Sequence, residues 1–456
     1  MKRTLFIILL AVAMLVTGIP VAGAGPAGTV GINVLLDRAV SPSILRELRG
    51  FGPVLDILSP INALTMRIRN DKLAAIRALP YVVAAEPDAE RSGAPVDRVA
   101  ATDFADGIST WDQDAINVVD FGATGRAVDY DGEGVYVAVL DTGLVDSWRS
   151  YFPQERIAVE YARSFGGGGG EAGTVSSQPN KWEHDQDSHG THVTSSILGY
   201  SLNGKSVNGA APMATIIPVK VLNQNGSGWS SVIARGILYV AELKENELAD
   251  YPVVINMSLG GSRLDPVEKA AIDVAIEAGV IIVASAGNSG EAGMGYPGAY
   301  EPVISVAASG WTGEWSPEGN RSWWNNSDVA DPVSAADFYI ADFSSRALEG
   351  QDLDVAAPGS WIVGPYQVNS GTLGFYFLGG TSMASPHVAG IVALMAQKDP
   401  TLDAMRAEQI LQDSAIPLGD GSCVINTPTG TETVIWGGDA TGHGLATADA
   451  ALAMTP

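Results

Sequence analysis

Apolar residues beyond position 130 fall into short, largely uninterrupted runs separated by segments of helical character. Runs of this kind are typical of strands in a parallel sheet, because helices cover both faces of such a sheet. The intervening segments Ser231–Asn246 and Pro266–Ala278 have the length and spacing of helices. The pattern therefore predicts an α/β domain with a parallel sheet flanked by helices, over residues 111–456. The predicted strands are Val135–Leu140, Ile216–Leu222, Val253–Met257 and Val280–Ala284.

Residues 29–90 predict a separate small unit. Its first helix has Ser41 as N-cap and Pro42 at the first helical position, both favourable at a helix start. The order of elements is βαββαβ, which predicts an α+β ferredoxin-like unit. The elements are expected at Thr29–Leu36, Ser41–Arg49, Val54–Leu58, Ala63–Arg69, Asp71–Leu79 and Tyr81–Ala85.

The first 24 residues have the pattern of a secretory signal peptide. Lys2 and Arg3 precede an apolar run from Leu5 to Val16, and the small residues of 22–24 follow it. An N-terminal membrane anchor is the alternative, but the run is short for a transmembrane span. We therefore expect residues 1–24 to be a signal peptide, the protein to be secreted into the extracellular medium, and no membrane association after cleavage.

Charge and cysteine content exclude several classes of function. The formal net charge is −25, and the acidic excess lies beyond residue 90. A body of this sign is not suited to bind nucleic acid or an anionic membrane surface. Cys423 is the single cysteine, so an internal disulfide, a dithiol redox centre and a multi-cysteine metal site are excluded.

The most informative segment is Gly379–Gly390, in which a glycine pair and a hydroxyl-rich turn precede an apolar helix. Ser382 is expected at the start of that helix. Free backbone N–H groups and the positive end of the helix dipole lie there, an arrangement that suits a nucleophile whose attack creates an oxyanion. A helix N-cap followed by a core helix is the simpler interpretation of the same residues.

Two further segments contain polar residues that could take part in catalysis or metal binding. Asp141 follows a predicted buried strand, the edge at which α/β sheets place their sites, although an aspartate that stabilises a turn would look the same. His189 and His192 lie three residues apart at the start of a predicted helix. Zinc binding is disfavoured because a third ligand and a general-base glutamate in the usual pattern are missing.

Taken together, these three segments resemble the motifs of the subtilisin-like serine proteases (subtilases). The order Asp…His…Ser is that of subtilisins and differs from the order in chymotrypsin-like enzymes and α/β-hydrolases. The resemblance implies that Ser382 is the nucleophile, His189 the general base and Asp141 the acid that orients it. It further implies that Asn288 donates to the oxyanion and that His192 is structural.

The resemblance also implies a substrate cleft for polypeptides. The family's matching segments pair with the substrate backbone as an added strand, and a glycine at the base of the main specificity pocket leaves room for a large side chain. On sequence alone, glycine-rich turns explain these segments equally well. The implied residues are Gly226, Ser227 and Gly228 on one wall, Ser258, Leu259 and Gly260 on the other, and Gly295 at the pocket.

Within the family, a unit such as 29–90 is an inhibitory propeptide that assists folding and lays its C-terminal tail, near Glu86–Arg91, in the cleft. Residues 87–115 predict an exposed linker, with the maturation site within 91–110. Residues 311–340 depart from the compact family pattern and predict a surface loop.

No cofactor is required. Structural Ca²⁺ is expected from the family, with no ligands assigned, because the loop after the histidine helix is unusual. We expect a monomer.

These observations predict a secreted serine endopeptidase made as a self-processed zymogen. One alternative is a secreted binding or scaffold protein with the subtilase fold and no turnover, which the four filled catalytic positions disfavour. Another is a lipase-like serine esterase, disfavoured by the triad order and by the lack of a Gly-x-Ser-x-Gly elbow.

Overall fold

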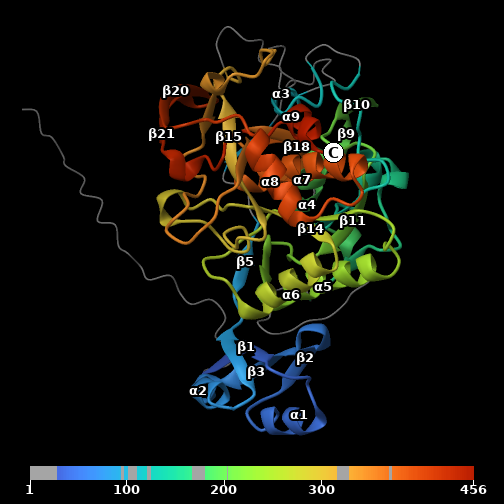
Figure 1. Ribbon diagram of the computed structural model, residues 1–456, viewed down its shortest axis with the longest axis vertical. Helices are drawn as coiled ribbons and strands as arrows, with labels where there is room; N and C mark the ends of the chain where they lie inside the picture. The colour runs from blue at the N-terminus through green and yellow to red at the C-terminus, as the bar shows by residue number, and fades with distance from the viewer. Residues whose placement is uncertain are drawn as a thin grey trace, which may run out of the picture.

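The computed structural model describes residues 28–93, 97–100, 110–120, 125–166, 180–202, 204–315, 328–368 and 372–456. A small N-terminal unit lies below a much larger domain, and the two are joined by a chain segment that includes strand β5 (Figure 1). The predicted signal peptide and most of the predicted maturation region lie outside the described residues. None of the helices in the described part has both the length and the apolar character needed to cross a membrane.

The large domain is built on a sheet whose strand order is β16-β15-β14-β13-β7-β11-β8, with β17 also paired to β15. All neighbouring pairs are parallel except β15 with β16. This confirms the predicted α/β class. The strands are β7 (Tyr136–Asp141), β8 (Arg163–Ser164), β11 (Thr215–Lys220), β13 (Val253–Met257), β14 (Val280–Ser285), β15 (Ile304–Trp311), β16 (Phe338–Ile340) and β17 (Val355–Pro358).

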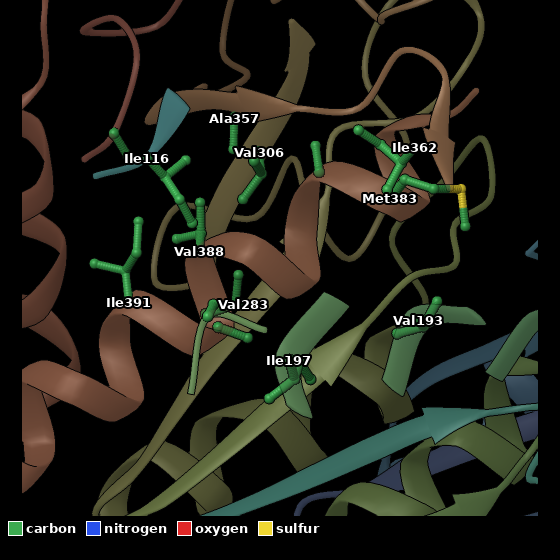
Figure 2. Close-up of a cluster of buried hydrophobic side chains, with 14 of the residues drawn as sticks. Ile116, Val193, Ile197, Val283, Val306, Ala357, Ile362, Met383, Val388 and Ile391 are labelled. Atoms are coloured by element: carbon green, nitrogen blue, oxygen red, sulfur yellow. The ribbon is translucent and has the colours of Figure 1, made fainter. Parts of the chain in front are cut away.

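Helices cover both faces of this sheet because its strands are apolar on both sides. Helices α4 (His189–Leu198) and α7 (Thr381–Lys398) pack on one face, and α5 (Ser230–Glu245) and α6 (Pro266–Glu277) pack on the other. Alternate residues of each strand therefore enter two separate hydrophobic clusters, as Val139 and Leu140 of β7 do. Figure 2 shows side chains of α4 and α7 meeting those of the sheet strands β14 and β15.

The N-terminal unit has the predicted element order and an antiparallel sheet in the order β2-β3-β1-β4. Ser41 caps the first helix by accepting a hydrogen bond from the Ile44 amide. The second helix is shorter than predicted because a 3₁₀ turn takes its start. The elements are β1 (Thr29–Leu36), α1 (Pro42–Leu48), β2 (Val54–Leu58), β3 (Ala63–Arg69), α2 (Leu73–Arg77) and β4 (Val82–Pro87).

This unit packs against the outer helices of the large domain. Leu58, Ile61 and Ala63 share a hydrophobic cluster with residues of α5 and α6. Asp88 accepts hydrogen bonds from the Ser231 amide (3.1 Å) and hydroxyl (2.6 Å). It thereby satisfies donors at the start of α5 that the helix itself leaves unpaired.

Two sequence expectations are wrong. The exposed linker predicted over 87–115 is not exposed at either end, because Arg91 and helix α3 (Trp111–Ala115) are buried. The predicted surface loop 311–340 begins and ends in the core, because Trp311 closes β15 and Phe338–Ile340 forms the buried strand β16 beside it. Apolar side chains pack in the core at Trp111 and at both ends of 311–340, whereas Arg91 is buried through its ion pair with Glu268.

Three hairpins among the described residues of the large domain and strand β6 were not predicted, whereas β5 lies in the tail that the family resemblance places in the cleft. One hairpin, β18–β19, also pairs with β6, and the segment β5 pairs with β12 in the large domain. The remaining elements are β5 (Glu90–Ser92), β6 (Asp97–Ala100), β9 (Gly199–Leu202), β10 (Lys205–Asn208), β12 (Ser227–Trp229), β18 (Ile362–Val368), β19 (Thr372–Gly379), β20 (Gly421–Thr427), β21 (Gly430–Trp436), α8 (Ala404–Ser414) and α9 (Ala448–Met454).

Candidate active site

Asp141 and His189 form a buried acid–imidazole pair. Asp141 is the last residue of β7 and His189 the first of α4. The two carboxylate oxygens each lie 2.9 Å from His189 Nδ1, and both side chains are fully buried. Burial by itself lowers the pKa of His189, but the charge and hydrogen bonds of Asp141 outweigh it and hold that pKa above 6.5. The arrangement makes Nδ1 the donor and leaves Nε2 as the acceptor of the neutral ring.

The local chain conformation fixes this pair. Ser188 adopts a left-handed conformation at φ 76°, and the Thr142 hydroxyl accepts a hydrogen bond of 2.8 Å from the Gly190 amide. A side chain at Gly190 would meet the Gly143 carbonyl at 2.5 Å. Glycine is therefore required there, because only a residue without Cβ lets the start of α4 approach the end of β7 so closely.

Ser382 is the second residue of α7, as the sequence predicted for the start of a helix. Its hydroxyl donates to the Ser258 carbonyl at 3.2 Å. His189 Nε2 is buried and has no hydrogen-bond partner among the described residues. A Cβ built on Gly93 would lie 2.6 Å from the Ser258 carbonyl and 3.2 Å from His189 Cε1. Ser382 and His189 thus border the same small space, with no hydrogen bond joining them in this state.

Asn288 is held against the start of α7. Its side-chain oxygen accepts from the Thr381 amide and from the Thr381 hydroxyl, each at 2.9 Å. These two donors fix the orientation of the amide, so its Nδ2 faces the other way, toward Gly380, where a built Cβ would lie 3.6 Å from it. The same built Cβ would lie 3.7 Å from the Ser382 amide nitrogen, so Nδ2 and that nitrogen both border Gly380.

The predicted cleft residues line a groove that holds the tail of the N-terminal unit. β5 pairs antiparallel with β12, placing Arg91 opposite Gly228. On the same side, the Gly93 amide donates to the Gly226 carbonyl at 2.9 Å, and on the other side Ser92 and Gly260 exchange two backbone hydrogen bonds of 3.1 Å. The tail therefore lies as a central strand between two walls, the geometry of β-augmentation.

The other predicted cleft positions lie around these walls. Leu259 is buried under the second wall, and Gly295 lies beside it, because the adjoining Tyr296 exchanges backbone hydrogen bonds of 2.7 and 2.9 Å with Gly261. Ser227 lies in β12 itself. The structure thus brings together all of the substrate-binding residues named from the sequence.

His192 has a different environment from His189. It is fully buried, and its Nε2 lies 3.1 Å from the Ile362 carbonyl, to which it donates. Burial lowers its pKa to about 3, so the ring is neutral at physiological pH. Its contact with the β18 backbone matches a structural role.

A buried polar network that was not predicted from the sequence lies behind Asp141. Lys220 donates to the Thr142 carbonyl, and Asp185 accepts from the Thr142 hydroxyl at 2.7 Å and the Ser188 amide at 2.9 Å. Burial raises the pKa of Asp185 to about 7, although nearby Lys220 lowers it. The signal that could have identified this network is Lys220 within the predicted strand Ile216–Leu222, because the parallel register of the two strands places Lys220 opposite Asp141.

Three carboxylates elsewhere lie within 4.8 Å of one another: Asp352, Asp354 and Glu408. Both oxygens of Asp354 already accept hydrogen bonds, from Ser305 and Gln412. Oxygen ligands of this kind suit calcium in general, but donors inside the protein already engage both oxygens of Asp354. The calcium expected from the family therefore stays a prediction without assigned ligands.

Comparison with known proteins places the chain in a family. The model of the subtilase family of peptidases matches residues 132–448. Subtilisin DY of Bacillus licheniformis is 35% identical over 299 residues, which cover 65% of this chain and 88% of that protein. Subtilisin E of Bacillus subtilis is 35% identical over 295 residues, covering 64% of this chain and 63% of that protein.

Solved structures agree on the fold. Fervidolysin from Fervidobacterium pennivorans, described as a keratinolytic enzyme related to subtilisin, superposes with a TM-score of 0.64 at 24% identity, over 94% of this chain and 61% of that one. Sphericase superposes with a TM-score of 0.54 at 27% identity, over 75% of this chain and 99% of its own. With the family match over most of the large domain, the chain belongs to the subtilase family and is a serine endopeptidase.

Proposed function

We propose that the protein hydrolyses peptide bonds through Ser382, His189 and Asp141, by way of an acyl-enzyme. The observation that carries this proposal is the buried Asp141–His189 pair, whose unpartnered Nε2 borders the same space as Ser382. A peptide strand already lies in the groove beside that space. A nucleophile, a base and a bound backbone are thereby gathered at one place.

In the proposed reaction, the Ser382 hydroxyl turns from the Ser258 carbonyl toward Nε2 and attacks the peptide carbonyl carbon. His189 takes the hydroxyl proton and later gives it to the leaving amine, while Asp141 holds the tautomer and stabilises the imidazolium. Water then attacks the acyl-enzyme. His189 takes the proton of the water and returns it to the Ser382 oxygen as the acid product leaves. No cofactor takes part in these steps.

The negative charge that develops on the substrate oxygen needs donors already in place. The side-chain amide of Asn288 and the backbone N–H of Ser382 are suited to this role. The two hydrogen bonds from Thr381 keep the amide from turning its oxygen into the site. A neutral donor favours the transition state because the charge appears only there.

We further propose that residues 29–90 are an inhibitory propeptide, and that the protein is exported as a zymogen and processes itself. Support comes from the tail that this unit lays along the cleft and from its packing on α5 and α6. With that tail in place, another polypeptide cannot pair with Gly228 or Gly260. The mature enzyme is proposed to act outside the cell, as a monomer, on polypeptide substrates.

The test is intact mass over time for the wild type and Ser382→Ala, both expressed without residues 1–24. We expect the wild type to lose a fragment of propeptide size and Ser382→Ala to stay whole. The new N-terminus then identifies the bond cut in maturation.

Two other outcomes have different meanings. If both proteins stay whole and the wild type hydrolyses no peptide, the fold serves as a catalytically silent binding or scaffold protein. If both are cut alike, a contaminating protease is responsible, and Ser382 has no role in the cleavage observed.

A further inference from the structure

The guanidinium of Arg91 is fully buried although it belongs to the tail in the cleft and not to the large domain. Its Nε donates to Glu268 Oε1 at 3.1 Å, and its Nη2 donates to Glu268 Oε2. Neither side chain is exposed. We infer that the pocket closed by Glu268 is a substrate subsite selective for arginine, which rests on the proposed peptidase function and names a class of its substrates.

The contacts match the shape of a guanidinium and not merely its charge. Two parallel hydrogen bonds to one carboxylate form the bidentate fork that arginine makes and lysine cannot. A third nitrogen donates to the Glu90 carbonyl at 3.0 Å within the same strand. The large domain contributes a further acceptor, the Arg263 carbonyl at 3.3 Å from Nη2. A substrate strand would carry the Glu90 carbonyl in its own backbone.

The pocket wall leaves room for this group. A Cβ built on Gly261 would lie 2.7 Å from Arg91 Nη1 and 2.5 Å from the Glu90 carbonyl. Because glycine at 261 has no side chain, the strand backbone and the guanidinium can both lie against this wall. Glu268 itself lies in the first turn of α6, whose N-cap is Asp265. Its backbone position is set by that helix, so the carboxylate belongs to the large domain and not to the tail.

Selection follows from burial of the carboxylate. When a neutral side chain fills the pocket, it leaves Glu268 desolvated without a counter-charge, whereas an arginine pairs with it. Removing one partner of a buried, hydrogen-bonded charge pair at an interface weakens binding by about 30-fold or more. We therefore expect the subsite to reject neutral residues more strongly than it rejects lysine.

The register of the tail in the cleft gives the position of the arginine relative to the cleaved bond. Arg91 is two residues before Gly93, where a built Cβ would lie 2.6 Å from the Ser258 carbonyl and 3.2 Å from His189 Cε1. If the carbonyl attacked is that of the residue against His189, the arginine is the third residue before the cut bond. If it is that of the following residue, the arginine is the fourth.

The experiment uses the active protein, expressed as its full chain and purified after maturation. Internally quenched peptides of one fixed sequence carry arginine at each of the second to fifth positions before the cut bond, which mass spectrometry identifies. Matched peptides carry glutamine, lysine or leucine there. We expect kcat/KM to be at least about 30-fold higher for arginine than for glutamine at the third or fourth position, and at that position only.

Glu268→Gln is the informative variant, because it keeps the side-chain volume and removes the charge. It should lower kcat/KM for the arginine peptide by about 30-fold and change it little for the glutamine peptide. Glu277→Gln, an exposed acid at the far end of α6, is the matched control and should keep the preference.

Equal kcat/KM for the arginine and glutamine peptides in the wild type would overturn the subsite while leaving the peptidase in place. So would a Glu268→Gln variant that loses activity equally on both peptides, since that marks a structural role. Hydrolysis of none of the peptides by the wild type would overturn the proposed function and the subsite together.

Discussion

The Ser258 hydroxyl donates a 2.7 Å hydrogen bond to the backbone carbonyl of Ser382. In an ordinary helix, that carbonyl accepts from the amide four residues later, but position 386 is proline and has no N–H. Ser258 supplies the missing donor from the neighbouring cleft wall. The first turn of α7, which carries the proposed nucleophile, is thus tied to a wall of the substrate groove.

Ser258→Ala should destabilise the fold by about 1–3 kcal/mol, because it leaves a buried carbonyl without a donor. Urea unfolding in a Ser382→Ala background, which prevents self-digestion, measures the free energy of unfolding. Ser262→Ala, at an exposed position nearby, is the control. Equal stability of the two variants would show that water or another donor replaces Ser258.

Asp141→Asn should reduce kcat by about 10⁴-fold, because an amide favours the wrong imidazole tautomer. The wild type should also show a distinctive pH profile. His189 acts as a base only when neutral and its pKa is raised, so kcat/KM should fall as the pH drops through a value above 6.5. The variant's residual activity should lose this limb or show it at lower pH. An unshifted limb would assign the titration to another group.

Asn288→Ala should lower kcat by roughly 10²–10³-fold, the size measured for the loss of such a donor in a subtilisin. KM should change little, since the amide acts on charge present only in the transition state. Asn288→Gln serves as the comparison, with the amide kept but displaced. A variant that raised KM and kept kcat would instead place Asn288 in substrate binding.

Met383 is fully buried directly after Ser382, and a Cβ on Gly380 would lie 3.7 Å from its sulfur. Oxidation to the sulfoxide would place a polar oxygen beside the proposed oxyanion donors. We expect peroxide to reduce the activity of the wild type, and Met383→Leu to retain activity under the same treatment. Peptide mapping tells whether residue 383 is the methionine oxidised. Full activity after its oxidation would count against this placement.

The sequence predicted most strands, and the places of the proposed catalytic residues in their elements, because each depends on neighbouring residues. Asp141 follows its own apolar strand, and Ser382 begins its own helix. Contacts between distant segments could not be predicted in this way. Arg91 and Glu268 are 177 residues apart, and either alone is an ordinary surface charge. Trp311 looked like part of a polar loop because its partner strand, Phe338–Ile340, lies at the opposite end of that same stretch, beyond many polar residues.

The carboxylate cluster of Asp352, Asp354 and Glu408 should make stability depend on pH. Burial, followed by repulsion from its acidic neighbours, raises the pKa of Glu408 to about 8. Since this lies above the ordinary glutamate pKa of 4.5, the folded state holds the proton more tightly than the unfolded chain. The contribution to stability is therefore fully present at low pH and is lost as the pH rises from about 5 through 8.

Glu408→Gln should remove this loss. Because the group is half-exposed, solvent screening leaves an expected gain of about 1 kcal/mol at pH 9 and little change at pH 5. Urea unfolding in EDTA, again in the Ser382→Ala background, measures both values without bound cations. Glu155→Gln, an exposed acid far along the chain, controls for net charge. A gain of the same size in both variants would attribute the effect to general repulsion in an acidic protein and not to this cluster.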